Sequence, residues 1–303
     1  MRKHWWILIA YLVLSLVLTW PLASHLTTHV PGDGIDDPSL AWNLWWVKHS
    51  LVDQPQNPFA CDWQFWPIGI NLAFYTLTVL NGMLGIPVTS ATSVIISYNI
   101  LLLLSFVLSG YGAFLLAREL MPRRWRRRVL APFAGGALFA FASAKLFYAA
   151  LGQGNIASSQ WVPFAMLYFI RAARPSGNWR DGTLAGLFIV LQAYAEQTYA
   201  SFLLLFAVLA AVWGIVEVWS SPTRDVAVQD GGGTPGAKRG SGMLGLSGRF
   251  ALSALIFIVG IAPFLANMLP DMSREGNFFS SGGDFADQFS ADLMGYLLPT
   301  QLH

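Results

Sequence analysis

The sequence predicts an all-α membrane protein, a polytopic bundle of about seven transmembrane helices with a long first outer loop that carries membrane-parallel helices. Hydrophobic residues make up 55% of the 303 residues and charged residues only 11%, whereas a soluble domain carries about 25% charged residues. Apolar runs of roughly 20 residues, enough to cross a hydrocarbon core of about 30 Å, recur along the chain. Arginine and lysine gather at the ends of some runs, as they do on the cytoplasmic side of membrane proteins.

The first run covers residues 5–22 and follows Arg2 and Lys3. No small-residue cleavage site follows it, which favours an uncleaved anchor over a signal peptide. The two basic residues place the N-terminus in the cytoplasm, so residues 25–91 form an outer loop.

The second span, predicted over 94–116, ends in the sequence "ARELMPRRWRRR". These arginines mark a cytoplasmic end; such a cluster can also contact nucleic acid or lipid headgroups, but its place beside a span favours topology. Only one return crossing then fits between the two cytoplasmic ends. The apolar stretch 72–88, interrupted by Gly82, Gly85 and Pro87, is therefore predicted to be an interfacial or re-entrant helix.

Five more spans complete the bundle. They are predicted over 131–149, 159–173, 182–196, 199–219 and 249–269. Residues 220–248 are predicted as a flexible cytoplasmic loop and residues 270–303 as an outer loop, within a single transmembrane domain, 1–303, of the cell membrane. Of the 18 Lys and Arg residues, those on or near the outer side are Lys48, Lys145 and Arg274, which agrees with this topology.

The outer loop opens with "PGDGIDDPSLAWNLWW", residues 31–46. Asp33, Asp36 and Asp37 stand among glycines and precede Pro38, so we expect them in a turn at the start of a helix. Backbone N–H groups and the helix dipole favour ionised carboxylates there, as a general base or a cation ligand requires. Asp37 can also be simply the N-cap of the helix, which leaves Asp33 and Asp36 free.

The predicted helix 38–51 carries Trp42, Trp45 and Trp46 on one broad face. Because tryptophan is enriched at membrane–water interfaces, we expect this helix to lie flat on the outer surface. The acids would then lie beside an apolar groove. A substrate with a lipid tail would place its polar head at the acids.

Other polar residues on the predicted outer side are candidate substrate ligands. Gln153 and Asn155 lie in the second outer loop. Glu196 interrupts an apolar stretch at membrane depth, where a carboxylate is costly, although it can also mark a tight turn at the headgroups. Lys145 either contacts substrate or snorkels to the interface, and Arg274 is a second candidate cation.

Two histidines and one cysteine give weaker signals. His25 and His29 flank the acids but lack an evident third metal ligand, which disfavours a zinc site. Cys61 is the single cysteine, so the chain can form no internal disulfide and no cysteine-based zinc pattern.

These features resemble polytopic glycosyltransferases of the GT-C class, in particular bacterial dolichyl-phosphate-mannose mannosyltransferase-like enzymes. The similarity lies in a first span, the acidic motif "GDGIDDPSLAWNLWW", the segment "NPFACDWQFWPIGINLAFYTLTVLNGMLGIP", and the span and basic turn "YNILLLLSFVLSGYGAFLLARELMPRR". The segment "GQGNIASSQWVPFAMLYF" also looks like a second-loop motif of bacterial members, in which histidine usually replaces Gln153. Members are usually longer, so the resemblance implies a form truncated after "YLLPTQLH".

The resemblance implies an inverting transfer of a sugar from a polyprenyl-phosphate carrier to an acceptor on the extracytoplasmic face. Asp36 or Asp37 would deprotonate the acceptor hydroxyl, with Asp33 assisting. A divalent cation, Mg²⁺ or Mn²⁺, would be held by Asp33 and Asp36. Lys145 or Arg274 would stabilise the departing phosphate. The implied partners are the polyprenyl-phosphate-linked sugar and membrane lipid, with no nucleic acid.

Two other classes stay open. A transporter or flippase uses charged or broken-helix sites near the midplane, usually in repeated halves, whereas here the charge lies at one predicted surface and the halves do not match. A noncatalytic, truncated membrane protein is the third alternative.

Overall fold

The structure is a computed structural model and describes residues 4–125, 128–220 and 235–275. Two compact units make up the chain, Met1–Ala262 and Pro263–His303. The candidate site lies in the first unit. The described part of the second unit is the last stretch of a long helix.

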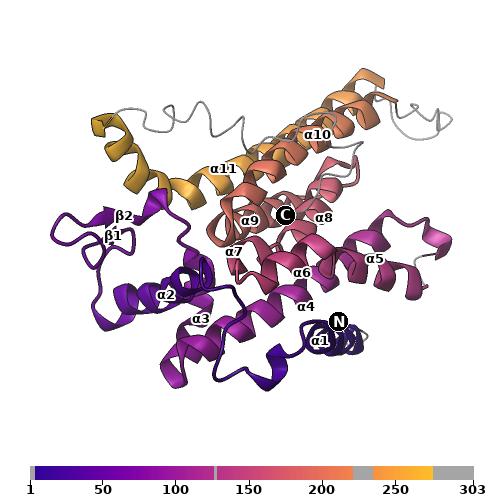
Figure 1. Cartoon of the computed structure of the whole chain (residues 1–303). Helices are drawn as coiled ribbons and strands as arrows, with labels where there is room; N and C mark the ends of the chain where they lie inside the picture. Colours follow the sequence, from indigo (N-terminus) through magenta and orange to yellow (C-terminus); the bar gives the residue numbers. More distant parts are fainter. Residues whose placement is uncertain (1–3, 126–127, 221–234, 276–303) are drawn as a thin grey trace, which may run out of the picture. The chain divides into compact units, whose positions relative to one another are not determined.

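Helices form almost all of the described structure (Figure 1). The elements of the first part are α1 (Trp5–Leu18), η1 (Leu22–Ser24), α2 (Asp37–Lys48), η2 (His49–Asp53), β1 (Ala60–Cys61), β2 (Ile70–Asn71), η3 (Leu72–Phe74), α3 (Val79–Ala91) and α4 (Val94–Leu120). They are followed by η4 (Arg123–Trp125), α5 (Leu130–Ala140), α6 (Ser143–Ala150), α7 (Gly154–Ala157), α8 (Val162–Ala173), α9 (Trp179–Ala195), α10 (Gln197–Ser220) and α11 (Pro235–Glu275). In the described residues, β1 and β2 form one antiparallel pair with Ala60 opposite Asn71.

Three helices in the described part of the chain are long and apolar enough to cross a membrane: Val94–Leu120, Gln197–Ser220 and Gly242–Arg274. A fourth crossing results if α5 and α6, which meet at a bend of 40°, form one broken span. These are the helices of a multi-pass membrane protein.

The predicted count of seven spans is not confirmed. Each predicted segment contains a helix, but α1 has 14 residues and α8 has 12. At 1.5 Å per residue these helices are about 21 Å and 18 Å long, less than the roughly 30 Å hydrocarbon core. Helix α1 ends ahead of Pro21, and α8 begins only at Val162, so each helix is shorter than its apolar run.

Helix α4 is the centre of the first unit and packs against α1, α2, α3, α5 and α8 (Figure 1). Small residues permit this close packing, because a Cβ at Gly110 would collide with the Tyr11 ring and a Cβ at Gly112 with the Phe164 ring. Small residues serve the same purpose in other membrane helix bundles. A core of Leu40, Leu44, Tyr98, Leu102, Leu103, Phe106 and Ala149 joins α2, α4 and α6.

Helices α8, α9 and α10 form a second core, built largely from alanines such as Ala165, Ala185 and Ala200. The opposite side of α10 exposes large apolar side chains, which include Phe202, Leu205, Val208, Leu209 and Val212. Contiguous apolar exposure of this kind marks a membrane or partner surface, and its place on a helix of spanning length assigns it to lipid.

Basic residues from α8 and α11 gather at one end of the first unit. Arg171 and Arg174 at the end of α8 bind Glu119 of α4, with N–O distances of 2.6 and 2.5 Å. Arg249 of α11 donates to the carbonyls of Ala172, Arg174 and Gly177 at 2.7, 3.0 and 3.1 Å. The sequence places these arginines on the cytoplasmic side, and the structure brings them together.

Two segments that are predicted to be loops are partly helical in the structure. Helix α11 begins at Pro235, inside the predicted loop 220–248, while residues 221–234 lie outside the described residues. The predicted outer loop 270–303 begins inside α11, and residues 276–303 also lie outside them. In the predicted first outer loop, the stretch 72–88 overlaps α3, whose 13 residues are too few for a complete crossing.

Candidate active site

The acidic turn, residues 32–37, is closed by its own carboxylates. The Gly34 N–H donates to Asp37 Oδ1 at 2.8 Å, and the Ile35 N–H donates to Asp33 Oδ1 at 3.1 Å. Helix α2 begins at Asp37, with Asp36 at the N-cap position and no side-chain cap hydrogen bond. The alternative in which Asp37 is the N-cap is therefore off by one residue, because the first helical bond runs from the Leu40 N–H to the Asp36 carbonyl.

The acidic turn rests on the loop that follows α6. Gln153 Nε2 donates to Asp36 Oδ2 at 2.5 Å. Gly152 has a φ of 76°, which favours glycine, and a Cβ there would collide with Asp37, Gly32 and the carbonyl of Pro31. Glycine is thus required twice, for the backbone angle and for the close approach.

Two polar side chains of helix α4 form hydrogen bonds that position the loop after α6 and the segment before the acidic turn. Tyr98 Oη donates to the Gly152 carbonyl at 2.5 Å and accepts from the Gly154 N–H at 3.1 Å. Asn99 Nδ2 donates to the carbonyls of Leu26 and His29 at 3.0 and 2.8 Å. Two adjacent polar residues of α4 therefore position the segment before the acidic turn and the loop against it.

The other two predicted outer residues meet next to this loop. Asn155 Nδ2 donates to Glu196 Oε2 at 2.9 Å. Glu196 Oε1 accepts the Thr198 N–H at 3.1 Å, so Glu196 also stabilises the first turn of α10. Glu196 therefore marks the turn between α9 and α10 and contacts Asn155, and its role toward a substrate stays a prediction.

The three aspartates differ in exposure and in their partners. Asp33 is exposed, Asp36 is half-buried and Asp37 is buried. Asp36 Oδ1 has no hydrogen-bond partner among the described residues, while Oδ2 is held by Gln153. Asp36 therefore combines a fixed orientation with an oxygen that can accept a proton.

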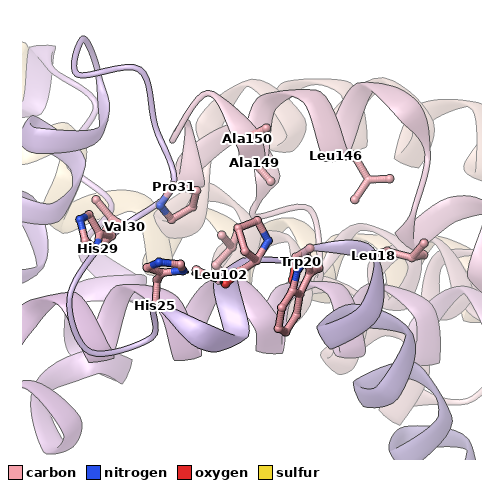
Figure 2. Close-up of a pocket in the computed structure, with 13 residues that line it drawn as sticks. Leu18, Trp20, His25, His29, Val30, Pro31, Leu102, Leu146, Ala149 and Ala150 are labelled. Carbon is pink, nitrogen blue, oxygen red and sulfur yellow. Dashed lines mark hydrogen bonds between the residues drawn. The ribbon is translucent and has the colours of Figure 1, made fainter.

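An apolar cavity of about 620 Å³ lies beside the acidic turn. Its walls come from the end of α1, residues 19–31, Leu102 of α4 and one face of α6, and they include Leu18, Trp20, Leu146 and Ala149. Figure 2 shows Leu18 and Leu146 at one end and His29, Val30 and Pro31 at the other. Pro31 directly precedes the acidic turn, and the volume is within the range of about 300–1,000 Å³ typical of ligand pockets.

Lys145 points into the helix bundle. Its Nζ donates to the Ser105 carbonyl, Ser109 Oγ and Ser159 Oγ at 3.2, 2.6 and 3.4 Å. The side chain is 7% exposed and does not line the cavity, which rules out snorkelling as its function. Arg274 is exposed near the end of α11, in the second unit, so its role stays a prediction.

The residues present do not by themselves fit a divalent cation. In the described residues no group of three or more His, Cys, Asp or Glu side chains has a metal-binding arrangement. The predicted ligands are only two carboxylates, Asp33 and Asp36, and each uses one oxygen to accept a hydrogen bond. The chemistry proposed below therefore includes no step through a metal.

The tryptophans of α2 do not form the expected membrane-facing surface. Trp46 is fully buried and donates from Nε1 to the Pro58 carbonyl at 2.8 Å, because the segment 58–72 folds back over α2. Trp42 stacks on Trp46 with ring centroids 5.4 Å apart. The exposed aromatic side chains of this region instead include Trp63, Phe65 and Trp66, at 56%, 66% and 76% exposure.

The sequence pattern did not identify the residues that position the acidic turn and the loop against it. Tyr98 and Asn99 are polar residues inside the apolar run of α4, and that interruption was the available signal. The sequence pattern suggests a metal-ligand role for His25 and His29, whereas in the structure both line the cavity. Their position beside the cavity depends on tertiary contacts that a linear pattern does not contain.

The fold and the site define a polytopic membrane protein with an apolar cavity next to an acidic turn. No protein-family model matches the sequence, and no curated protein matches it. Among solved structures, the chain is similar to the Archaeoglobus fulgidus oligosaccharyltransferase in the apo form, with a TM-score of 0.47, 17% identity and coverage of 100% of this chain and 40% of that one. It is also similar to the archaeal oligosaccharyltransferase AglB from Archaeoglobus fulgidus in complex with an inhibitory peptide and a dolichol-phosphate, with a TM-score of 0.45, 17% identity and coverage of 94% and 38%. The chain thus spans about two fifths of the length of these structures.

Proposed function

We propose that this protein is a membrane glycosyltransferase of the GT-C class, which moves a sugar from a polyprenyl-phosphate carrier to an acceptor hydroxyl on the extracytoplasmic face. The observation that supports this function is the apolar cavity of about 620 Å³ that ends at Pro31. An isoprenoid chain in this cavity buries apolar surface. Its sugar-phosphate head then lies at the acidic turn.

Asp36 is the proposed general base. Gln153 holds one carboxylate oxygen and leaves the other without a partner among the described residues. Asp37 accepts the Gly34 N–H and is buried, so its function is to maintain the turn. Asp33, exposed at the same turn, assists by adding negative charge near the acceptor.

The proposed reaction is a single displacement with inversion. The acceptor oxygen attacks the anomeric carbon while its proton passes to Asp36 Oδ1. The bond between the anomeric carbon and the phosphate oxygen breaks, and its electron pair stays on the phosphate. The products are the glycosylated acceptor and polyprenyl phosphate, and positioning by Gln153 contributes because the base must lie within hydrogen-bond reach of the acceptor.

Transfer of label tests this function directly. Purified protein in lipid nanodiscs would be incubated with short-chain polyprenyl phosphates that carry different labelled hexoses, together with a mixture of candidate acceptors. We expect release of polyprenyl phosphate and a labelled product of inverted configuration for at least one hexose. Absence of any consumption of donor across the panel would contradict the proposal.

A transporter or flippase is the alternative that one observation favours. Lys145 is an ionisable residue inside the bundle, and such residues often mark transport pathways. Its ammonium is already bound by three serine oxygens, as expected of a residue that links helices. Solute uptake or lipid translocation by proteoliposomes, without consumption of donor, would support transport instead.

A further inference from the structure

Two histidines are the titratable side chains among the described residues that line the cavity. The His29 N–H donates to the His25 carbonyl at 3.1 Å, so one helical turn places the two side chains on the same face. Their ring centroids are 5.4 Å apart in an edge-to-face arrangement. Figure 2 shows both rings near the end of the cavity where Val30 and Pro31 lie.

The protein binds one nitrogen of each ring and leaves the other available. His25 Nδ1 lies 3.2 Å from the Pro21 carbonyl and 2.9 Å from Ser24 Oγ. The hydroxyl of Ser24 itself donates to the Pro21 carbonyl, so both oxygens act as acceptors and Nδ1 carries the proton. His29 Nδ1 lies 2.9 Å from Thr28 Oγ1. Neither Nε2 atom has a partner among the described residues.

The backbone that carries this pair is fixed. Asn99 Nδ2 donates to the carbonyls of Leu26 and His29, and Asn99 is fully buried in α4. A pair of rings on an anchored turn is preorganised for a ligand, which lowers the entropy cost of binding.

No lysine or arginine is found among the described residues on the cavity wall. Lys145, the nearby candidate for the phosphate, uses its ammonium on three serine oxygens. An anion at the head of a lipid in this cavity would therefore meet the two rings, whose Nε2 atoms donate hydrogen bonds when the rings are protonated.

We propose that His25 and His29 bind the phosphate of the polyprenyl carrier, an assignment that rests on the proposed function for the identity of the ligand. Each protonated ring donates from Nε2 to a phosphate oxygen in a charge-assisted hydrogen bond. Negative charge on the phosphate grows as its bond to the sugar breaks, so the same donors stabilise the leaving group.

Binding of a matched pair of lipids tests this assignment. The probes are farnesyl phosphate and farnesol, titrated into the full chain in detergent with EDTA present, so that no bridging metal contributes. We expect wild-type protein to prefer the phosphate by at least about tenfold, because hydrogen bonds in which donor and acceptor are ionised are stronger than neutral ones. The double variant His25→Gln/His29→Gln should lose most of this preference and retain its affinity for farnesol.

Controls separate this proposal from loss of folding and from the proposed function. Thr27→Ala changes an exposed residue of the same turn and should keep the preference, and single variants of the two exposed histidines should each lose part of it. Equal affinity of wild type for both lipids, or an unchanged preference in the double variant, would overturn the assignment. If the phosphate preference depends on the histidines and no sugar is transferred, the anion site stands and the glycosyltransferase proposal falls.

Discussion

At the residue scale, the three aspartates of the acidic turn differ in the hydrogen-bond partners of their carboxylate oxygens. Asp37 accepts a backbone N–H inside the turn, and Asp33 does so at its exposed edge. Asp36 is bound by a side chain from a distant loop and keeps one oxygen available. The carboxylate with an external partner and a free oxygen is the one suited to receive a proton.

Asp36→Asn should lower the rate of sugar transfer by about 10²- to 10⁴-fold, the usual contribution of a general base. The amide keeps the shape of the side chain, so the thermal midpoint should change little. Asp62→Asn, an exposed acid of the same outer segment, is the matched control and should transfer at the wild-type rate. Transfer by Asp36→Asn at the rate of the control would exclude Asp36 as the base.

Gly152→Ala should destabilise the protein by more than Gly34→Ala. Both glycines have positive φ angles, 76° and 85°, and a non-glycine residue in that region costs about 1–3 kcal/mol. A Cβ at Gly34 meets open space, whereas one at Gly152 collides with the acidic turn. Thermal unfolding in detergent would measure both variants, and equal midpoints would show that the loop and the turn are not in close contact.

At the element scale, polar side chains hold the walls of the cavity in place. Lys145 of α6 donates to Ser105 and Ser109 of α4, and Leu146 and Ala149 on the same helix line the cavity. Helix α6 is only eight residues long, so these bonds fix an element that has little stability of its own.

Arg249→Met should destabilise the first unit by about 2–4 kcal/mol, since it leaves three backbone carbonyls without their donor at roughly 1 kcal/mol each. The guanidinium of Arg249 binds the carbonyls that end α8 and begin the turn to α9. Arg180→Met removes an exposed arginine from α9 and serves as the control. Thermal midpoints that fall equally in both variants would argue against a specific role for Arg249.

At the scale of the whole molecule, charged and polar groups separate into two sets. Asp36 with Gln153 and Asn155 with Glu196 make up one set, and Glu119 with Arg171 and Arg174 makes up the other. Apolar helices of spanning length connect regions of this kind in membrane proteins. The positive-inside rule predicts that the arginine set lies on the cytoplasmic side.

Cysteine labelling tests this orientation. In a Cys61→Ala background, Ile35→Cys at the exposed acidic turn should react with a membrane-impermeant maleimide in intact cells. Ser176→Cys, exposed in the turn between α8 and α9, should react only after the membrane is opened. The reverse pattern would invert the topology and place the acidic turn in the cytoplasm.

Part of the site could be predicted from the sequence because its signals are local. Glycines and Pro38 around the aspartates predicted a turn at a helix start, and the structure contains it within one residue. The role of Trp46 could not be predicted in this way, because its burial depends on a segment that folds back from residues 58–72. The count of seven spans is not confirmed, since hydropathy measures the apolar run and not the length of the helix within it.

The helical class, the clusters of charge and the acidic turn could be predicted from the sequence, because composition, periodicity and turn chemistry act over short stretches of chain. Which residues meet depends on the tertiary fold. It joined Asp36 to Gln153, turned Lys145 into the bundle and placed His25 and His29 on an apolar cavity. Those outcomes depend on packing between helices far apart in the chain, where a glycine that admits a close approach or a tyrosine that binds a carbonyl selects one arrangement.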